Sequence, residues 1–168
     1  MRDAAVSWTR WLLVSAAVVA LDLATKAWVS AAFSPGETRE MTSFFNLVLM
    51  YNTGAAFSFL ANAGGWQRWF FTVVTIAISA VIVYMLRRQH GDRTVAVALA
   101  LVLGGALGNL YDRLTLGHVV DFIQLHAAGY YWPAFNVADS AITVGVGLLI
   151  WDSLTAGAGA KAAGQEKP

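Results

Sequence analysis

The chain contains no cysteine among its 168 residues. This absence excludes a disulfide framework, a thiolate nucleophile and any metal site built on cysteine. Charged residues are also few, at 12% of the chain against about a quarter in soluble domains, while 58% of the residues are hydrophobic and the mean hydropathy is +0.58. The net charge of +1 gives no basis for a nucleic-acid surface. The composition therefore predicts a membrane protein.

Four segments are apolar and close to the length of about 20 residues that a membrane-spanning helix needs. They are residues 11–33, 69–86, 94–111 and 133–151. The two central segments contain no charged residue, whereas the first contains Asp22 and Lys26 and the last contains Asp139. A central charge costs a spanning helix only about 2.5–3.5 kcal/mol, so all four are predicted to span. The first segment has an alternative interpretation as a cleaved signal peptide, although two charges four residues apart have no use there.

The distribution of basic residues predicts how the chain is oriented, because cytoplasmic loops carry an excess of Lys and Arg. With the N-terminus in the cytoplasm, the cytoplasmic basic residues are Arg2, Arg10, Arg87, Arg88, Arg93, Lys161 and Lys167. The extracytoplasmic ones are then Lys26, Arg39, Arg68 and Arg113. Both termini are therefore predicted to be cytoplasmic, with residues 34–67 and 112–132 outside.

The segment 34–67 is too long for a simple turn and has its own sequence signals. Residues 41–51 mix aromatic and branched side chains as short strands do, and a turn signal precedes them. Residues 54–66 fit a short surface amphipathic helix, with a plain loop as an equal alternative. We predict one domain, residues 1–168, of an all-α polytopic membrane protein with four transmembrane helices, a small extracytoplasmic β cradle and this surface helix. The polar tail, residues 155–168, is predicted to be disordered.

Polar side chains converge where the third and fourth spans meet the extracytoplasmic face. Asn136 and Asp139 share one helix face, and Asp121 follows the exit of the third span, so both carboxylates are expected at the same depth. Two carboxylates in a poorly hydrated place share one proton, so that one serves as a base and the other as an acid. A structural alternative stays open, in which Asp121 pairs with Arg113 and Asp139 with the N-terminal end of its helix.

Other catalytic schemes find less support. The sequence has neither the G-x-S-x-G nor the H-E-x-x-H motif. Ser30 lies four residues after Lys26, but an ion pair between Lys26 and its acidic neighbour explains that lysine more simply. His118, Asp121 and His126 have the chemistry of metal ligands, but three such residues arise readily by chance in one loop. From another class of function, intramembrane carboxylates also fit a small proton-coupled transporter.

Four motifs, in this order, resemble those of the lipoprotein signal peptidases, also called signal peptidase II. They are DLATK (residues 22–26), YNTGAAFSFL (51–60), GGALGNLYDRLTLGHVVDF (104–122) and FNVADSAI (135–142). The resemblance covers most of the chain between the first and fourth spans. It implies an aspartyl endopeptidase of the bacterial inner membrane, with its active site near the extracytoplasmic face. Such an enzyme cleaves the signal peptide of a prolipoprotein just before a diacylglyceryl-modified cysteine.

The same resemblance assigns roles to individual residues. Asp121 and Asp139 would be the catalytic pair, in agreement with the charge argument. Residues implied to bind substrate or support the site are Asn52, Gly54, Gly105, Asn109, Arg113 and Asn136. Asp22 and Lys26 are expected to support the architecture. We expect diacylglyceryl-modified prolipoproteins and membrane lipid as partners, a monomer, no nucleic acid, and neither a cofactor nor a metal.

Overall fold

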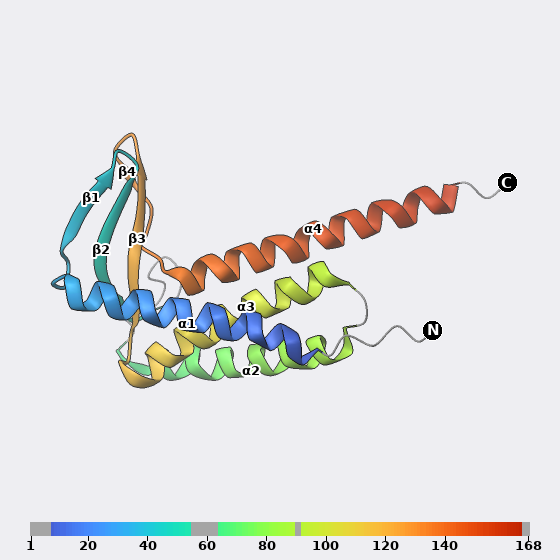
Figure 1. Ribbon diagram of the computed structural model, residues 1–168, viewed down its shortest axis with the longest axis horizontal. Coiled ribbons are helices and arrows are strands. Elements are labelled where there is room, and N and C mark those ends of the chain that lie inside the picture. Colours follow the sequence, from blue (N-terminus) through green and yellow to red (C-terminus); the bar gives the residue numbers. More distant parts are fainter. Residues whose placement is uncertain (1–7, 55–63, 90–91, 166–168) are drawn as a thin grey trace.

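The computed structural model describes residues 8–54, 64–89 and 92–165, with side chains described as far as residue 155. The elements are α1 (Thr9–Ala32), β1 (Thr38–Thr42), β2 (Phe45–Asn52), α2 (Trp66–Arg88), α3 (Arg93–Thr115), β3 (Val119–Ala127), β4 (Tyr130–Tyr131) and α4 (Val137–Gln165). All four helices are long and apolar enough to cross a membrane, which confirms the predicted fold class. The sheet stands at one end of the helices, while the start of α1 and the end of α4 lie at the other (Figure 1).

Helix α3 is the centre of the bundle, because it packs against all three other helices. Against α2 it forms an apolar cluster that includes Leu86 and Leu99. Against α1 and α4 the helix backbones themselves come close. A Cβ on Gly104 would lie 2.8 Å from the Ser15 carbonyl oxygen, and one on Gly145 would lie 2.7 Å from that of Ala98. Small residues at these crossings let the helices approach closely, as the packing of membrane helices requires.

Helix α4 differs at both ends from the expected span of residues 133–151. It begins at Val137, because Phe135 pairs with Ile123 of β3 and the next residue caps the helix. At the other end the helix continues to Gln165, over most of the segment expected to be disordered. That segment is rich in alanine, which has the highest intrinsic helix propensity. Toward its C-terminal end α4 diverges from the other helices (Figure 1).

The sheet is antiparallel, with the strand order β1-β2-β3-β4. Strand β2 and the end of β1 account for the predicted β element, but β3 and β4 come from residues 112–132, which we predicted only as an extracytoplasmic connection. Asp121 therefore lies within a strand, opposite Met50 of β2, and not at the exit of a helix. Polar residues within β3 hide its pattern of branched and aromatic side chains, which otherwise favours a strand.

An apolar cluster joins the sheet to the end of α1. Its buried members are Val29, Phe33, Leu49, Val120 and Phe122. This cluster holds β2 and β3 against the helix bundle, which brings the polar residues of the two strands to the helix ends. The predicted surface helix falls mainly on residues 55–63, which lie outside the described residues.

Candidate active site

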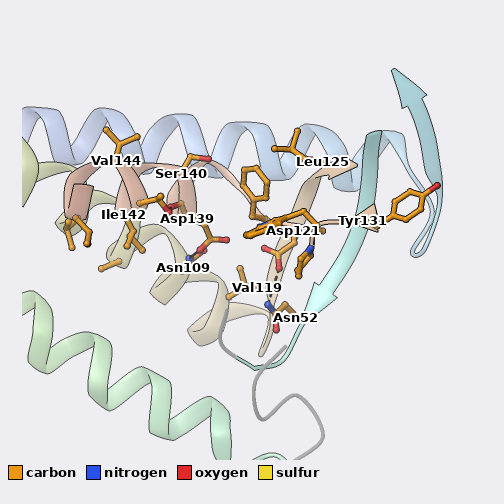
Figure 2. Close-up of a pocket in the computed structure, with 18 of the residues that line it drawn as sticks. Asn52, Asn109, Val119, Asp121, Leu125, Tyr131, Asp139, Ser140, Ile142 and Val144 are labelled. Carbon is orange, nitrogen blue, oxygen red and sulfur yellow. Dashed lines mark hydrogen bonds between the residues drawn. The ribbon is translucent and has the colours of Figure 1, made fainter. Parts of the chain in front are cut away.

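Asp121 and Asp139 meet at the junction between the sheet and α4. The backbone of Phe135 exchanges hydrogen bonds with Ile123, with N···O distances of 2.9 and 2.8 Å. This pairing lays the first turn of α4 against β3. Figure 2 shows the carboxylates of Asp121 and Asp139 directed into the same cavity from these two elements.

Asn136 joins the two aspartates and has no exposed surface. Its Nδ2 donates to Asp121 Oδ1 at 2.8 Å, and its backbone N–H donates to Asp139 Oδ2 at 3.3 Å. Its own Oδ1 accepts from the backbone N–H of Asp139 at 2.9 Å. The last two bonds form a reciprocal cap at the start of α4, of the kind called a capping box. The structural alternative is therefore correct for Asp139, which caps its helix and still faces the cavity.

The second oxygen of each carboxylate also accepts from an amide. Asn52 Nδ2 donates to Asp121 Oδ2 at 3.1 Å, across the diagonal of the β2–β3 pair. Asn109 Nδ2 donates to Asp139 Oδ1 at 2.7 Å from α3. Each aspartate is thus held through both oxygens by neutral donors. Among the described residues no ion pair joins Asp121 to Arg113, so that part of the structural alternative is not supported.

The surroundings of Asp121 favour its protonated form. Only 3% of the residue is exposed. Burial, followed by the charge of Asp139, raises the pKa of Asp121 to about 7, although contacts with Asn52 and Asn136 and the charge of Lys26 act in the opposite direction. A carboxyl group with such a pKa can hold a proton near neutral pH and release it there, as acid–base catalysis requires.

Lys26 lies buried beneath this pair and contacts three side chains. Its ammonium group is 2.7 Å from Asp22 Oδ2 and 2.9 Å from Asp112 Oδ2, and it donates to Asn109 Oδ1 at 3.0 Å. The ion pair expected between Asp22 and Lys26 is present, and it makes α1 an integral part of the interior. Ser30 is exposed on the same helix, which gives no support to a Ser–Lys site.

Asp112 is not among the predicted site residues, although it lies at the end of the third span, where polar side chains converge. Asp112 is 2% exposed and accepts from the backbone N–H of Val120 at 3.1 Å as well as from Lys26. One signal for it was available, since Asp112 follows Asn109 by three residues and therefore shares its face of α3.

Arg113, Gly54 and Gly105 complete the predicted set. Arg113 donates to the carbonyl oxygen of Gly54 at 3.1 Å and to that of Asn109 at 3.4 Å. Gly54 in turn donates its backbone N–H to Asn52 Oδ1 at 2.9 Å. Gly105 faces the backbone of Ala138, so that a side chain there would collide with the Ala138 carbonyl oxygen. The structure thus brings every predicted site residue into one region.

A cavity of about 1550 Å³ opens beside the aspartates. Its polar wall is formed by Asn52, Asn109, Arg113, Asp121 and Asp139. Most of the remaining wall is apolar and includes Ile78, Val102, Ile142, Val144, Val146 and Trp132. A pocket with a few convergent polar groups and a long apolar wall fits a ligand of mixed character.

The histidines of the connection between α3 and α4 do not form a metal site with Asp121. His118 packs on the ring of Tyr51 at a centroid distance of 4.2 Å, and His126 Nε2 lies 3.1 Å from Asn46 Oδ1. Within residues 8–54, 64–89 and 92–165, no three His, Asp or Glu side chains are placed to hold one ion. The metal-ligand alternative therefore finds no support in this geometry.

Comparisons with known proteins agree with this geometry. The family described as signal peptidase (SPase) II matches residues 14–155. The chain is 56% identical to a lipoprotein signal peptidase of Paraburkholderia phytofirmans over 144 residues, 86% of this chain and 84% of that protein. It is 50% identical to one of Azoarcus sp. (strain BH72) over 167 residues, 99% of this chain and 95% of the other.

Solved structures also resemble this chain. One, described as a bacterial membrane enzyme, superposes with a TM-score of 0.80 at 34% identity and covers 95% of this chain and 92% of its own. Nothing in these comparisons favours the transporter alternative. The matched segment runs from α1 through α4 and contains both aspartates, and the chain belongs to the signal peptidase II family.

Proposed function

We propose that this protein is an intramembrane aspartyl endopeptidase that removes signal peptides from prolipoproteins. Cleavage would occur just before the diacylglyceryl-modified cysteine. The observation that carries the proposal is the convergence of Asp121 and Asp139, from β3 and α4, on one cavity. The names of the relatives, lipoprotein signal peptidases, support the substrate class.

In the proposed reaction a water molecule lies between the two carboxyl groups. The ionised carboxylate takes a proton from this water as its oxygen attacks the scissile carbonyl carbon, while the protonated carboxyl donates to the carbonyl oxygen. The tetrahedral diol collapses as the C–N bond breaks. The carboxyl group that took the proton from water gives it to the leaving nitrogen, and a hydroxyl of the diol returns a proton to the other carboxylate. The products are a carboxylic acid and a free amine, and no acyl-enzyme forms.

The amide side chains around the pair have a clear use in this scheme. Asn52, Asn109 and Asn136 donate to the carboxylates, so they hold the oxygens in place while protons move. Arg113 lines the cavity and retains donors that can meet substrate carbonyl groups. The apolar wall would receive the acyl chains of the modified cysteine beside the scissile bond. Protein side chains supply every proton transfer, so the scheme needs neither cofactor nor metal.

The proposed location follows from the substrate. A signal peptide is a short membrane helix whose cleavage site reaches the outer face of the bacterial inner membrane. Asp139 is only the third residue of α4, so it lies close to one end of the bundle. We propose that this end is extracytoplasmic, that both termini are cytoplasmic, and that a monomer surrounded by lipid is the active form.

The direct test is cleavage of a diacylglyceryl-modified prolipoprotein by the purified protein in detergent. We expect Asp121→Asn and Asp139→Asn each to lower the turnover rate by about 10³-fold or more, as the loss of one member of a catalytic unit does. Asp152→Asn is the matched control, because Asp152 also lies on α4 but far along the helix from the pair. It should retain the wild-type rate.

Two outcomes would contradict the proposal. A folded Asp121→Asn or Asp139→Asn protein that cleaves at near the wild-type rate removes that residue from catalysis. Equal cleavage of a precursor that lacks the diacylglyceryl group argues against the proposed substrate class.

Wild-type activity should also fall as the pH rises above about 7, because the raised pKa of Asp121 marks where the pair loses its proton.

A further inference from the structure

The ammonium group of Lys26 has three protons and three acceptors around it. The acceptors are Asp22 Oδ2 on α1 and Asp112 Oδ2 and Asn109 Oδ1 on α3, at 2.7, 2.9 and 3.0 Å. Only 3% of Lys26 is exposed. The ammonium group of Lys26 is therefore surrounded by oxygens of the protein itself, and its position depends on three other side chains.

Each of the three acceptors leads directly to a member of the aspartate pair. Asp112 Oδ2 accepts from the backbone N–H of Val120, the residue before Asp121, at 3.1 Å. Asp22 Oδ1 accepts from the backbone N–H of Ala138, the residue before Asp139, at 2.9 Å.

The third acceptor reaches the pair through its side chain, since Asn109 donates to Asp139 Oδ1 at 2.7 Å. Its Oδ1 lies on the same amide and accepts from Lys26 at 3.0 Å and from Asn136 Nδ2 at 3.2 Å, so these two donors together determine which way the amide faces. With the Lys26 proton on Oδ1, the NH₂ group must point to Asp139.

We propose that Lys26, together with Asp22 and Asp112, is a positioning centre that fixes the two catalytic carboxylates relative to each other and sets their shared charge. The inference rests on the proposed aspartyl mechanism and goes beyond the supporting role expected for Asp22 and Lys26. Lys26 touches no reacting atom in this arrangement. It acts through strand β3, through the first turn of α4 and through Asn109.

The charges of this centre act on the pair with opposite signs. When ionised, Asp22, Lys26 and Asp112 carry one net negative charge. The other charged group that interacts with both aspartates is Arg113 of α3, whereas His118, which follows that helix, interacts with Asp112. Removing Lys26 makes the surroundings more negative, so the pair should keep its proton to higher pH. Removing the negative charge of Asp112 should lower the pH at which the pair loses its proton, because Asp112 then no longer offsets the positive charge of Lys26.

The experiment compares Lys26→Met, Asp112→Asn and the double variant in the purified full-length protein. The readouts are kcat, KM and the pH at which kcat/KM falls on the alkaline side. We expect Lys26→Met to lower kcat by about 10- to 100-fold with little change in KM, as misplaced catalytic groups do. We call the pH at which kcat/KM falls on the alkaline side the alkaline limb. In Lys26→Met this limb should move up by about one pH unit, and in Asp112→Asn it should move down by about as much.

The double variant separates charge from position. It restores the net charge of the wild-type centre, so its alkaline limb should return to the wild-type pH while its kcat stays low. If Lys26→Met does not fold, Asp112→Asn and Asp22→Asn still test the proposal, because asparagine keeps the shape of the side chain and an oxygen acceptor. Both should shift the limb downward.

Matched controls come from the exposed ion pair of Glu37 and Arg39 beside β1, whose side chains lie 2.7 Å apart. Arg39→Gln and Glu37→Gln make the same charge changes there and should leave kcat and the limb unchanged. Folded centre variants with wild-type kcat and limb, or a limb of Asp112→Asn or Asp22→Asn that shifts upward as that of Lys26→Met is expected to, overturn the positioning centre. Failure of the aspartyl mechanism is distinct, since it would be seen as undiminished cleavage by Asp121→Asn.

Discussion

Asp139 combines a contact that stabilises the fold with its proposed role in catalysis. Its carboxylate accepts from the backbone N–H of Asn136, which closes the cap of α4, and from Asn109, which turns it toward the cavity. Capping interactions of this kind are each worth about 0.5–2 kcal/mol. Asp139→Asn would therefore disturb the helix start as well as the reaction, so folding must be measured in that variant before its activity is interpreted.

Asp121 makes a cleaner test of the charge at the site. Its folded-state pKa of about 7 lies above the value near 3.9 of an unfolded aspartate, so the native protein binds the proton more tightly. Its contribution to stability is thus complete below about pH 4 and is lost as the pH rises through about 7. Asparagine stays neutral, and Asp121→Asn should melt at a higher temperature than the wild type at pH 8 but not at pH 5.

Thermal unfolding in detergent at the two pH values measures this difference. Glu37→Gln is a suitable control, because Glu37 is only partly buried and hydrogen bonding from Ser34 lowers its pKa, so its removal should bring no gain at pH 8. If Asp121→Asn and the wild type keep the same difference in melting temperature at both pH values, burial does not hold a proton on Asp121.

At the scale of elements, hydropathy was enough to predict the four helices but not the sheet. Long apolar runs are a strong signal because only a helix or a closed barrel satisfies its backbone within a bilayer. Strand β3 carries a weak signal, since its pairing with β2 and with Phe135 depends on contacts between residues distant in sequence. The aspartate pair was nevertheless predictable, because it required only that the segment after the third span and the start of the fourth span lie at one face.

The contact between α3 and α4 gives a prediction for the glycines. In Gly105→Ala the new methyl group would meet the Ala138 carbonyl oxygen and push the first turn of α4 away from β3. Overpacking of this kind costs about 1–3 kcal/mol. We expect a lower melting temperature and a loss of cleavage of about tenfold or more, because Asp139 follows Ala138 directly.

The control for this change is Gly147→Ala on α4, where a Cβ would meet nothing within 4 Å. Melting temperature and cleavage should match or exceed the wild type there, since alanine is the better helix former. Equal losses of melting temperature and cleavage in Gly105→Ala and Gly147→Ala would show that replacing a glycine is enough to cause them, whether or not the helices approach closely at that position.

At the scale of the whole molecule, the sheet and the aspartates occupy one end of the bundle and the start of α1 and end of α4 the other (Figure 1). Geometry alone gives no direction across the membrane, because the two orientations are related by a simple rotation. The excess of basic residues predicts cytoplasmic termini. The sequence therefore predicts the orientation of the protein across the membrane, whereas the fold does not.

Labelling single cysteines tests this orientation, and the absence of native cysteine makes the experiment direct. Tyr130 at the tip of the sheet is 84% exposed, so Tyr130→Cys should react with a membrane-impermeant maleimide in cells whose outer membrane has been permeabilised. Gln89→Cys, at the end of α2, should react only after the inner membrane is broken. The reverse pattern would place the aspartates on the cytoplasmic side.

The polar and the apolar wall of the cavity differ in how well they tolerate amino-acid substitutions. On the polar wall, Asn52 and Asn109 each donate to one of the two aspartates, so a substitution that evades an inhibitor there would also impair the enzyme. On the apolar wall, Ile142, Val144 and Val146 are open to swaps of similar volume, which usually cost less than about 1.5 kcal/mol. Antibacterial compounds that depend on the apolar wall would therefore meet resistance sooner than compounds anchored on the carboxylates.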